Sequence, residues 1–263
     1  MRHQLALNAK RLIYGRRGEP YHIRGHTLRY LPGTRPVRLR YANDESPVVR
    51  YDALQMQLLS TGLGAGDTAI DIGAHCGQYC ILMAALCGPS GHVVAFEPDP
   101  YAREVLLKNL RLNPQVKPPI VEACAISDVE GAASLFSRGG NAQSSLARSA
   151  VEFSPADAAE QLPVRLTTLD SYLFEHKLPE PRWVKIDTEG AEIRILTGAR
   201  EVLAGNAQIV CELHPYAWPE LGNTLAELKT LAAAAGRRIR YLDQESEIGD
   251  HVEYGTVLLE RRS

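Results

Sequence analysis

Two strand ends in the first half of the sequence carry side chains suited to a nucleoside-like cofactor. An apolar segment ends in Asp71 and runs through a turn with Gly73 and Gly77 into an apolar helix. A second apolar segment, 92–96, ends in Glu97. In an open parallel sheet, a glycine turn lets the backbone approach a ligand, and an acid about 20 residues further on accepts ribose hydroxyls. Together the two segments predict a cofactor that contains a ribose.

The glycine spacing indicates which cofactor. Proteins that bind NAD or FAD hold the pyrophosphate with G-x-G-x-x-G, whereas this chain has G-A-H-C-G directly after Asp71 and Ile72. An acid beside the turn repels a pyrophosphate but can accept hydrogen bonds from an ammonium group, which S-adenosylmethionine carries. We therefore predict S-adenosylmethionine as the cofactor. A nicotinamide oxidoreductase would share the fold, but this chain lacks the triple-glycine turn that such an enzyme requires.

Two later strand ends supply groups that could catalyse a reaction. One apolar segment is followed by Asp187 and Glu189, and the next ends in Glu212 and His214. The carboxyl ends of parallel strands are where catalytic groups are expected. His214 has the unperturbed pKa that best suits a general base, Asp187 is the second candidate, and Glu189 could orient either one or bind a substrate hydroxyl.

Other roles for the acidic residues stay open. Glu192 has the position of a first-turn helix carboxylate stabilised by the helix dipole. Glu212 could have a purely structural role, as the ion-pair partner of Lys185. Asp187, Glu189 and Glu212 could also hold a magnesium ion, because Mg²⁺ prefers hard oxygen ligands. We favour a site without a metal.

The five cysteines predict packing rather than metal or redox chemistry. Cys76, Cys80 and Cys87 lack the C-x₃-C-x₂-C spacing of radical enzymes with an iron-sulfur cluster, and Cys124 and Cys211 lie alone in apolar segments. Structural zinc requires paired short spacings. An odd number of cysteines in apolar segments is typical of buried, reduced thiols.

Composition fits one enzyme domain with an extension. The chain has 263 residues, 45% hydrophobic and 23% charged, with a net charge of −2. The longest apolar run, 80–87, is far shorter than the roughly 18 residues of a membrane helix, and the first residues lack an apolar signal core. We expect a cytoplasmic protein without stable membrane insertion. Aromatic residues are too sparse among the basic ones to predict nucleic-acid binding.

The basic residues concentrate near the N-terminus. Residues 1–50 hold eleven Lys or Arg against three acids. Apolar and basic residues alternate over 27–31 and 37–41, which predicts two strands, and Pro32 with Gly33 predicts the turn between them. The pattern is that of a solvated hairpin face. Contact with a phosphorylated glycan, a nucleotide sugar or a membrane surface is the alternative.

The remaining elements alternate between helix and strand. After a helix over 47–62, this spacing predicts right-handed crossovers and a parallel sheet, with the last two strands antiparallel. The polar stretch 130–163 is predicted to be a mobile flap over the site. We divide the chain into an N-terminal basic extension, 1–61, and a cofactor-binding domain, 62–263. The predicted strands are 69–72, 93–96, 120–123, 183–186, 208–213, 239–242 and 256–260, and the later helices are 78–86, 101–112, 191–203 and 225–235.

Several motifs in order resemble one known family. The runs D-I-G-A-H-C-G, A-F-E-P-D-P, A-I-S-D-V-E-G, T-L-D-S-Y-L, K-I-D-T-E-G-A-E and E-L-H-P are similar to those of the FkbM family of S-adenosylmethionine-dependent O-methyltransferases. The likeness spans about residues 65–215, and K-I-D-T-E-G-A-E is its most diagnostic part. Family members typically have Asn where this chain has His75.

The resemblance implies a fold and a set of site residues. The fold would be α/β, a doubly wound, mostly parallel seven-stranded Rossmann-like sheet of the class I methyltransferases, with a small N-terminal β/α extension. The segment 141–146 would close over the ligands, and Asp187 would stand near the transferred methyl group. The cofactor-binding residues would be Asp71, Gly73, Ala74, His75, Gly77, Glu97, Pro98, Asp99, Ala125, Ile126, Ser127 and Asp187.

The resemblance also implies an acceptor class. We expect methyl transfer to a hydroxyl of a sugar, a glycan or a secondary metabolite. A carboxyl methyltransferase acting on a peptide or small molecule is the first alternative, because a carboxylate needs no base. A non-catalytic nucleotide-binding module of Rossmann type is the second.

The N-terminal hairpin could also pair across a two-fold axis in a homodimer.

Overall fold

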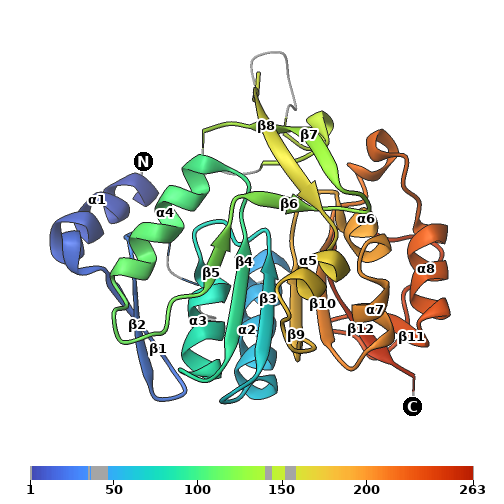
Figure 1. Ribbon diagram of the computed structural model, residues 1–263. Coiled ribbons are helices and arrows are strands. Elements are labelled where there is room, and N and C mark those ends of the chain that lie inside the picture. The colour runs from blue at the N-terminus through green and yellow to red at the C-terminus, as the bar shows by residue number, and fades with distance from the viewer. Residues whose placement is uncertain (1, 35, 37–46, 140–143, 152–157, 263) are drawn as a thin grey trace.

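A seven-stranded sheet forms the centre of the protein (Figure 1). The computed structural model describes residues 2–34, 36, 47–139, 144–151 and 158–262. The strands, in spatial order, are β11 (Arg237–Tyr241), β12 (Gly255–Arg261), β10 (Gln208–Leu213), β9 (Trp183–Ile186), β3 (Thr68–Ile72), β4 (His92–Phe96) and β5 (Ile120–Glu122). The predicted strands are all present, with ends that shift by a few residues.

The strand directions confirm the predicted fold class. From β10 to β5 every neighbouring pair is parallel, and only β12 runs antiparallel to both of its neighbours. The chain moves from β3 outward to β5 and then returns to place β9 on the other side of β3. Such a reversal opens a crevice beyond the carboxyl ends of the strands, where α/β proteins bind their ligands.

Helices cover both faces of this sheet. Side chains of α2, α3 and α4 pack on one face, and those of α5, α6, α7 and α8 pack on the other. All five cysteines are buried and free, which confirms their prediction as packing residues. The helix bounds are α1 (Arg2–Tyr14), α2 (Pro47–Gly62), α3 (Gln78–Cys87), α4 (Pro100–Arg111), α5 (Leu169–Glu175), α6 (Glu192–Thr197), α7 (Arg200–Ala204) and α8 (Leu225–Ala234).

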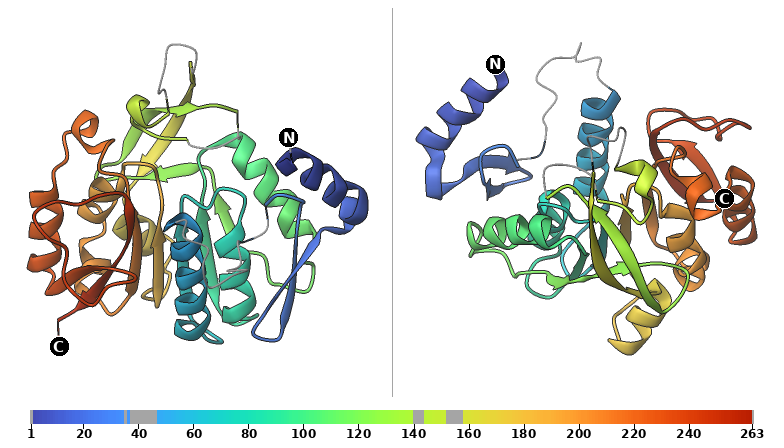
Figure 2. Two further views of the ribbon diagram at one scale, coloured as in Figure 1. Left: turned by 180° about the vertical axis from the view of Figure 1, so that it is seen from behind. Right: turned by 90° about the horizontal axis from the view of Figure 1, so that it is seen from above.

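The N-terminal hairpin pairs differently from the prediction. β1 (Glu19–Ile23) and β2 (His26–Tyr30) form an antiparallel pair, so the expected strand over 27–31 is present but its partner precedes it. The expected second strand, 37–41, lies outside the described residues. The hairpin packs beside α4, where Asn113 both accepts from and donates to the backbone of Arg29. Figure 2 shows this extension at the β5 edge, far from α8.

The division into two domains stays a prediction, although α2 packs directly on the main sheet. Met56 and Leu59 are buried against it, and the amide of Gln55 donates to the hydroxyl of Thr256 on β12.

In the described part of the chain no helix has both the length and the apolar character of a membrane span. The cytoplasmic location and the homodimer also stay predictions.

The described parts of the segment 130–163 are more regular than the broken flap that its polarity predicts. Its ends form β7 (Gly131–Ser137) and part of β8 (Glu160–Thr167), which join β6 (Cys124–Ile126) in a second, three-stranded sheet. Leu135, Val164 and Leu166 form the core of this small sheet. Few side chains of β7 and β8 are buried and small or polar residues are frequent in both strands, so composition alone misses them. The small sheet lies over the carboxyl ends of the main strands (Figure 1).

One predicted helix is interrupted. The expected helix over 191–203 is divided into α6 and α7, with Gly198 between them. A side chain at Gly198 would overlap the carbonyl oxygen of Ser127, so this position requires glycine for close packing. The close contact joins the end of α6 to the loop after β6.

The turns after β3 and β9 also touch each other. Gly73 has φ of 81°, and a side chain there would overlap the backbone carbonyl of Asp187. The amide groups of Gly73 and Ala74 both donate to the carbonyl of Phe96, at 3.0 and 3.1 Å. The glycine turn is therefore held against its two neighbouring strands, and this fixes the edge of the sheet where the predicted site lies.

Replacing Gly73 by Ala tests this close contact. Gly222 is the control, because it has φ of 73° in a left-handed conformation but open space around it. A left-handed backbone alone costs about 1–2 kcal/mol for a non-glycine residue, so Gly222→Ala should lose about that much stability in urea unfolding. Gly73→Ala adds overpacking and should lose about 3 kcal/mol or more. Equal losses would contradict the contact between the two turns.

Candidate active site

A cavity of about 310 Å³ lies beyond the carboxyl ends of β3, β4 and β9. Its volume is within the range of small-molecule sites. Glu97, Asp187 and Glu189 lie on its polar wall, whereas Phe96 and Ile126 belong to its apolar wall. Residues from three strands and the small sheet thus enclose one space.

The predicted cofactor residues divide into two groups. Seven lie on the cavity wall: Gly73, His75, Glu97, Pro98, Ala125, Ile126 and Asp187. Five lie behind the wall: Asp71, Ala74, Gly77, Asp99 and Ser127. The second group shapes the turns and the base of the site, and direct contact of these five with the cofactor stays a prediction.

Glu97 joins the glycine turn to the start of α4. One carboxylate oxygen accepts the amide of His75 at 2.6 Å, and the other accepts the amide of Asp99 at 2.8 Å. Each oxygen keeps a further lone pair, which suits the two adjacent hydroxyls of a ribose. Burial raises the pKa of Glu97 to about 7, although the two amide bonds act in the opposite direction.

His75 occupies a backbone conformation that few residues adopt. Its φ is 48°, in the left-handed region where Asn, Asp and His are enriched among non-glycine residues. The exchange of the family's Asn for His is therefore compatible with the turn. The exposed His75 side chain lies on the cavity wall, while its amide serves Glu97.

A charge pair with a buried lysine lies beneath the turn. The ammonium of Lys185 contacts Asp187 Oδ2 at 3.0 Å, so its ion-pair partner is Asp187 and not Glu212, the alternative partner that the sequence allows. Burial opposes the charge on Lys185, but Asp187, Asp71 and Glu212 together raise its pKa. Asp71 is fully buried, and burial raises its pKa to about 6 although the charge of Lys185 acts in the opposite direction. Asp71 and Lys185 therefore favour each other's charged forms beneath the turn.

The small sheet is tied to the cofactor side of the cavity. Asp99 caps α4 through the amides of Tyr101 and Ala102, and its other oxygen accepts the hydroxyls of Ser137 and Ser144. These hydroxyl bonds help to lower the pKa of Asp99, against the effect of burial.

The predicted closing segment, 141–146, is only partly described. Residues 141–143 lie outside the described residues, whereas Ser144, Ser145 and Leu146 line the cavity. Ser145 donates its hydroxyl to the carbonyl of Glu189 at 2.6 Å. The segment therefore contacts the loop after β9 as well as Asp99.

The surroundings of His214 differ from those expected of a free base. The ring is 1% exposed, and Nδ1 donates to Glu192 Oε1 at 2.8 Å. Nε2 lies 3.3 Å from Glu189 Oε2 and 4.0 Å from Glu212 Oε1. Burial alone would lower the pKa of His214, but the bond to Glu192 and the neighbouring carboxylates, including Asp187, raise it to about 10. The neighbouring carboxylates therefore move the pKa of His214 away from the unperturbed value that suits a general base.

Glu192 has a larger role than that of a helix-end carboxylate. It is fully buried and accepts three hydrogen bonds, from the amide of Gly190 at 2.7 Å, His214 Nδ1 at 2.8 Å and Trp218 Nε1 at 2.7 Å. Local sequence is a weak signal for this role, since two of the partners, His214 and Trp218, lie more than 20 positions further along the chain. Glu192 fixes the histidine ring and the loop after β9 together.

Two tyrosines beside the carboxylates were missed by sequence reasoning. Tyr216 donates to Glu189 Oε2 at 2.9 Å, and Tyr254 donates to Glu212. Their side chains are 45% and 39% exposed. Tyr216 follows the E-L-H-P motif closely and could have been noticed, but Tyr254 precedes β12 and reaches the site only through the antiparallel pairing with β10. These rings border the open side of the site.

Comparison with known proteins identifies the class. The sheet order and the cavity are those of a class I, Rossmann-like, S-adenosylmethionine-dependent methyltransferase. The chain belongs to the methyltransferase FkbM domain family, whose model matches residues 71–239. This confirms the predicted family and cofactor.

Individual relatives are distant. The chain is 24% identical to hexuronic acid methyltransferase AglP of Haloferax volcanii over 67% of its own length and 65% of that protein. A solved FkbM methyltransferase from Methylobacillus flagellatus is 13% identical, covers 81% of this chain and 52% of that one, and superposes with a TM-score of 0.45. An O-methyltransferase from Thermotoga maritima covers 80% of this chain and 64% of that one, with 13% identity and a TM-score of 0.43. The chain spans less than two thirds of the length of each of these proteins.

The cavity fits the family's cofactor. Glu97 presents free lone pairs to a ribose, and the apolar side chains of Phe96, Ala125 and Ile126 provide a surface for a purine ring. Asp187 and Glu189 place negative charge on the wall nearest the predicted methyl group, where a sulfonium cation would lie. The chemistry of these residues therefore agrees with S-adenosylmethionine binding.

Cofactor affinity should depend on pH through Glu97. The ionised carboxylate accepts ribose hydroxyls better than the neutral acid, and its pKa of about 7 places this change near neutrality. The affinity for S-adenosylhomocysteine should rise up to about tenfold from pH 6 to pH 8, as the ionised fraction rises. Isothermal titration calorimetry measures this change. Glu97→Gln should weaken binding about 10- to 100-fold and abolish the pH dependence.

Glu104→Gln is the matched control for this prediction. Glu104 is an exposed carboxylate on α4, paired with Lys108 at 2.7 Å, and it lies outside the cavity wall. Its removal should leave both the affinity and the pH dependence unchanged. If Glu97→Gln binds S-adenosylhomocysteine as tightly as the control, Glu97 does not contact the cofactor.

Proposed function

We propose that the protein transfers a methyl group from S-adenosylmethionine to a hydroxyl oxygen of a sugar, as part of a glycan. The observation that carries this proposal is the grouping of Asp187, Glu189 and Glu212 with two partly exposed tyrosine rings beside the cofactor cavity. Carboxylates accept hydrogen bonds from sugar hydroxyls, and tyrosine offers both an apolar face and a polar tip.

Only limited chemistry is required of the protein. The methyl group on a sulfonium is already activated, so the protein must place the acceptor oxygen in line with it and remove a proton. Glu189 is our candidate for the base, because it lies on the cavity wall next to Asp187. Tyr216 holds one of its oxygens at 2.9 Å.

His214 is less suited to take the proton directly. Its ring is buried, does not line the cavity and has both nitrogens directed at carboxylates. Asp187 is also less suited, because one of its oxygens is committed to Lys185. His214 and Asp187 are therefore better suited to orient neighbouring groups than to remove the proton from the sugar hydroxyl.

The alternative of carboxyl methylation has one observation in its favour. The relative from Haloferax volcanii is named for a hexuronic acid, which carries both hydroxyl groups and a carboxylate. The name supports a sugar acceptor and leaves the methylated oxygen open. Against a carboxylate acceptor stands the negative charge of Asp187, Glu189 and Glu212, which would repel it unless a cation intervened.

A product analysis separates the two reactions. Full-length protein is incubated with methyl-labelled cofactor and a panel of neutral sugars, uronic acids and oligosaccharides. Hydroxyl transfer forms a methyl ether that survives mild alkali, whereas carboxyl transfer forms an ester that alkali hydrolyses. We expect label that is stable to alkali. Label lost completely in alkali would establish the carboxyl alternative, and bound cofactor without transfer to any acceptor would favour a non-catalytic module.

Replacement of Glu189 by Gln tests the assignment of the base. The amide keeps the shape of the side chain but cannot accept a proton, so kcat for a hydroxyl acceptor should fall about 10²- to 10⁴-fold. The affinity for S-adenosylhomocysteine, which carries no sulfonium charge, should change less than about threefold in calorimetry. Glu104→Gln serves as the control with unchanged kcat. A kcat loss below about tenfold would exclude Glu189 as the base.

A further inference from the structure

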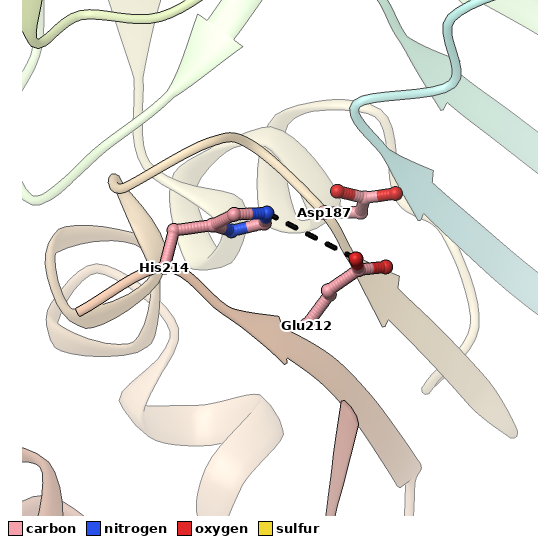
Figure 3. Close-up of side chains that lie close together, drawn as sticks. All are labelled: Asp187, Glu212 and His214. Atoms are coloured by element: carbon pink, nitrogen blue, oxygen red, sulfur yellow. Dashed lines mark ion pairs between the residues drawn. The ribbon is translucent and has the colours of Figure 1, made fainter. Parts of the chain in front are cut away.

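Three side chains at the ends of β9 and β10 converge on one point. Asp187 follows β9, while Glu212 and His214 belong to the end of β10 and the residues after it. Their nearest ligand atoms all lie within 4.8 Å of one another. Figure 3 shows the two carboxylates and the imidazole directed toward a common space.

The spacing is close to that of ligands around one metal ion. With metal–ligand bonds of about 2.1 Å, two ligands on opposite sides of an ion are about 4.2 Å apart. The observed spread is only slightly larger, and carboxylate rotation can close the difference. Lys185 holds Asp187 Oδ2 at 3.0 Å, and Oδ1 makes no hydrogen bond with the described residues. One oxygen of Asp187 therefore remains for an ion.

The orientation of the histidine provides a second observation. Its ring is 1% exposed, and Nε2 points at Glu189 Oε2, 3.3 Å away, and at Glu212 Oε1, 4.0 Å away. Nδ1 is held by Glu192, which is itself fixed by Gly190 and Trp218. Metal-binding histidines almost always donate their other ring nitrogen to a carboxylate or carbonyl in this way. The ring is thus oriented from behind, with Nε2 facing the carboxylates, and a metal ion there would take the place of the proton that Nε2 shares with Glu189.

We propose that Asp187, Glu212 and His214 bind one divalent transition-metal ion. Two carboxylate oxygens and one imidazole nitrogen form a mixed set that suits Mn²⁺ better than Mg²⁺ or Ca²⁺, which prefer oxygen alone. Three protein ligands leave positions open for water or substrate. The site differs from the magnesium alternative considered from the sequence, because His214 takes the place of Glu189.

The ion also has a use in the reaction, and this part rests on the proposed function. Asp187 belongs both to the cluster and to the cavity wall, so an acceptor oxygen on the ion would lie beside the cofactor cavity. Coordination makes a hydroxyl more acidic, as it does for metal-bound water. Glu189 would then accept a proton that leaves more readily. The ion would also offset the carboxylates and permit a sugar acid to approach.

The experiment is a Mn²⁺ titration of the full chain after treatment with a chelator and its removal. Electron paramagnetic resonance measures free Mn²⁺, and we expect one bound ion per chain. His214→Gln and Glu212→Gln should each weaken Mn²⁺ binding at least about tenfold. Glu104→Gln, the exposed carboxylate on α4, should bind like the unchanged protein. Calorimetry with S-adenosylhomocysteine confirms that each variant is folded, because neither His214 nor Glu212 lines the cofactor cavity.

Two results would overturn the proposal. One is the absence of stoichiometric Mn²⁺ binding in protein that binds S-adenosylhomocysteine, and the other is equal Mn²⁺ affinity in both variants and the control. Acceptor assays keep the two proposals apart. If hydroxyl methylation is undiminished in the presence of chelator and no Mn²⁺ binds, the ion site is rejected and the proposed function is retained. Mn²⁺ binding that is lost in both variants supports the ion site even if no hydroxyl acceptor reacts.

Discussion

The acceptor side of the site depends on one buried carboxylate. Glu192 is fully enclosed and accepts hydrogen bonds from Gly190, His214 and Trp218. A buried carboxylate is stable only when donors surround it, since burial without them costs several kcal/mol. These three donors come from the loop after β9 and the segment after β10. Satisfying Glu192 therefore brings together two loops that the sheet alone would leave independent, and sets the direction of the His214 ring.

A second carboxylate plays the same part on the cofactor side. Glu97 binds the amides of His75 and Asp99, which joins the turn after β3 to the start of α4. The two halves meet where Gly73 packs against the carbonyl of Asp187, a contact so close that only glycine fits. This contact fixes the position of Asp187 on the wall of the cavity. Its side chain is shared by both halves, which explains why it lines the cavity and also belongs to the acidic cluster.

The sequence predicts the local features of this site better than the contacts between distant segments. Apolar segments that end in Asp71, Glu97 and Asp187 specify strands of a parallel sheet, and glycine identifies the turn, so the main sheet follows. The second sheet is missed because its longer strands, β7 and β8, bury few side chains and contain many small or polar residues. The bond of Glu192 to Trp218 is missed because it depends on how two loops fold back, which no local pattern encodes.

The charge of the site has a consequence for catalysis. A sulfonium cofactor is a cation and its product is neutral, so negative groups on the wall favour binding of the reactant over the product. Stabilising the reactant's charge more than the transition state's would slow the transfer, because only differential binding accelerates a reaction. Lys185 moderates this effect, since its ammonium lies 3.0 Å from Asp187 and its charge is favoured by the nearby buried Asp71. The acid beside the glycine turn thus contributes, through its charge, to the electrostatic balance of this lysine and of the wall that it neutralises.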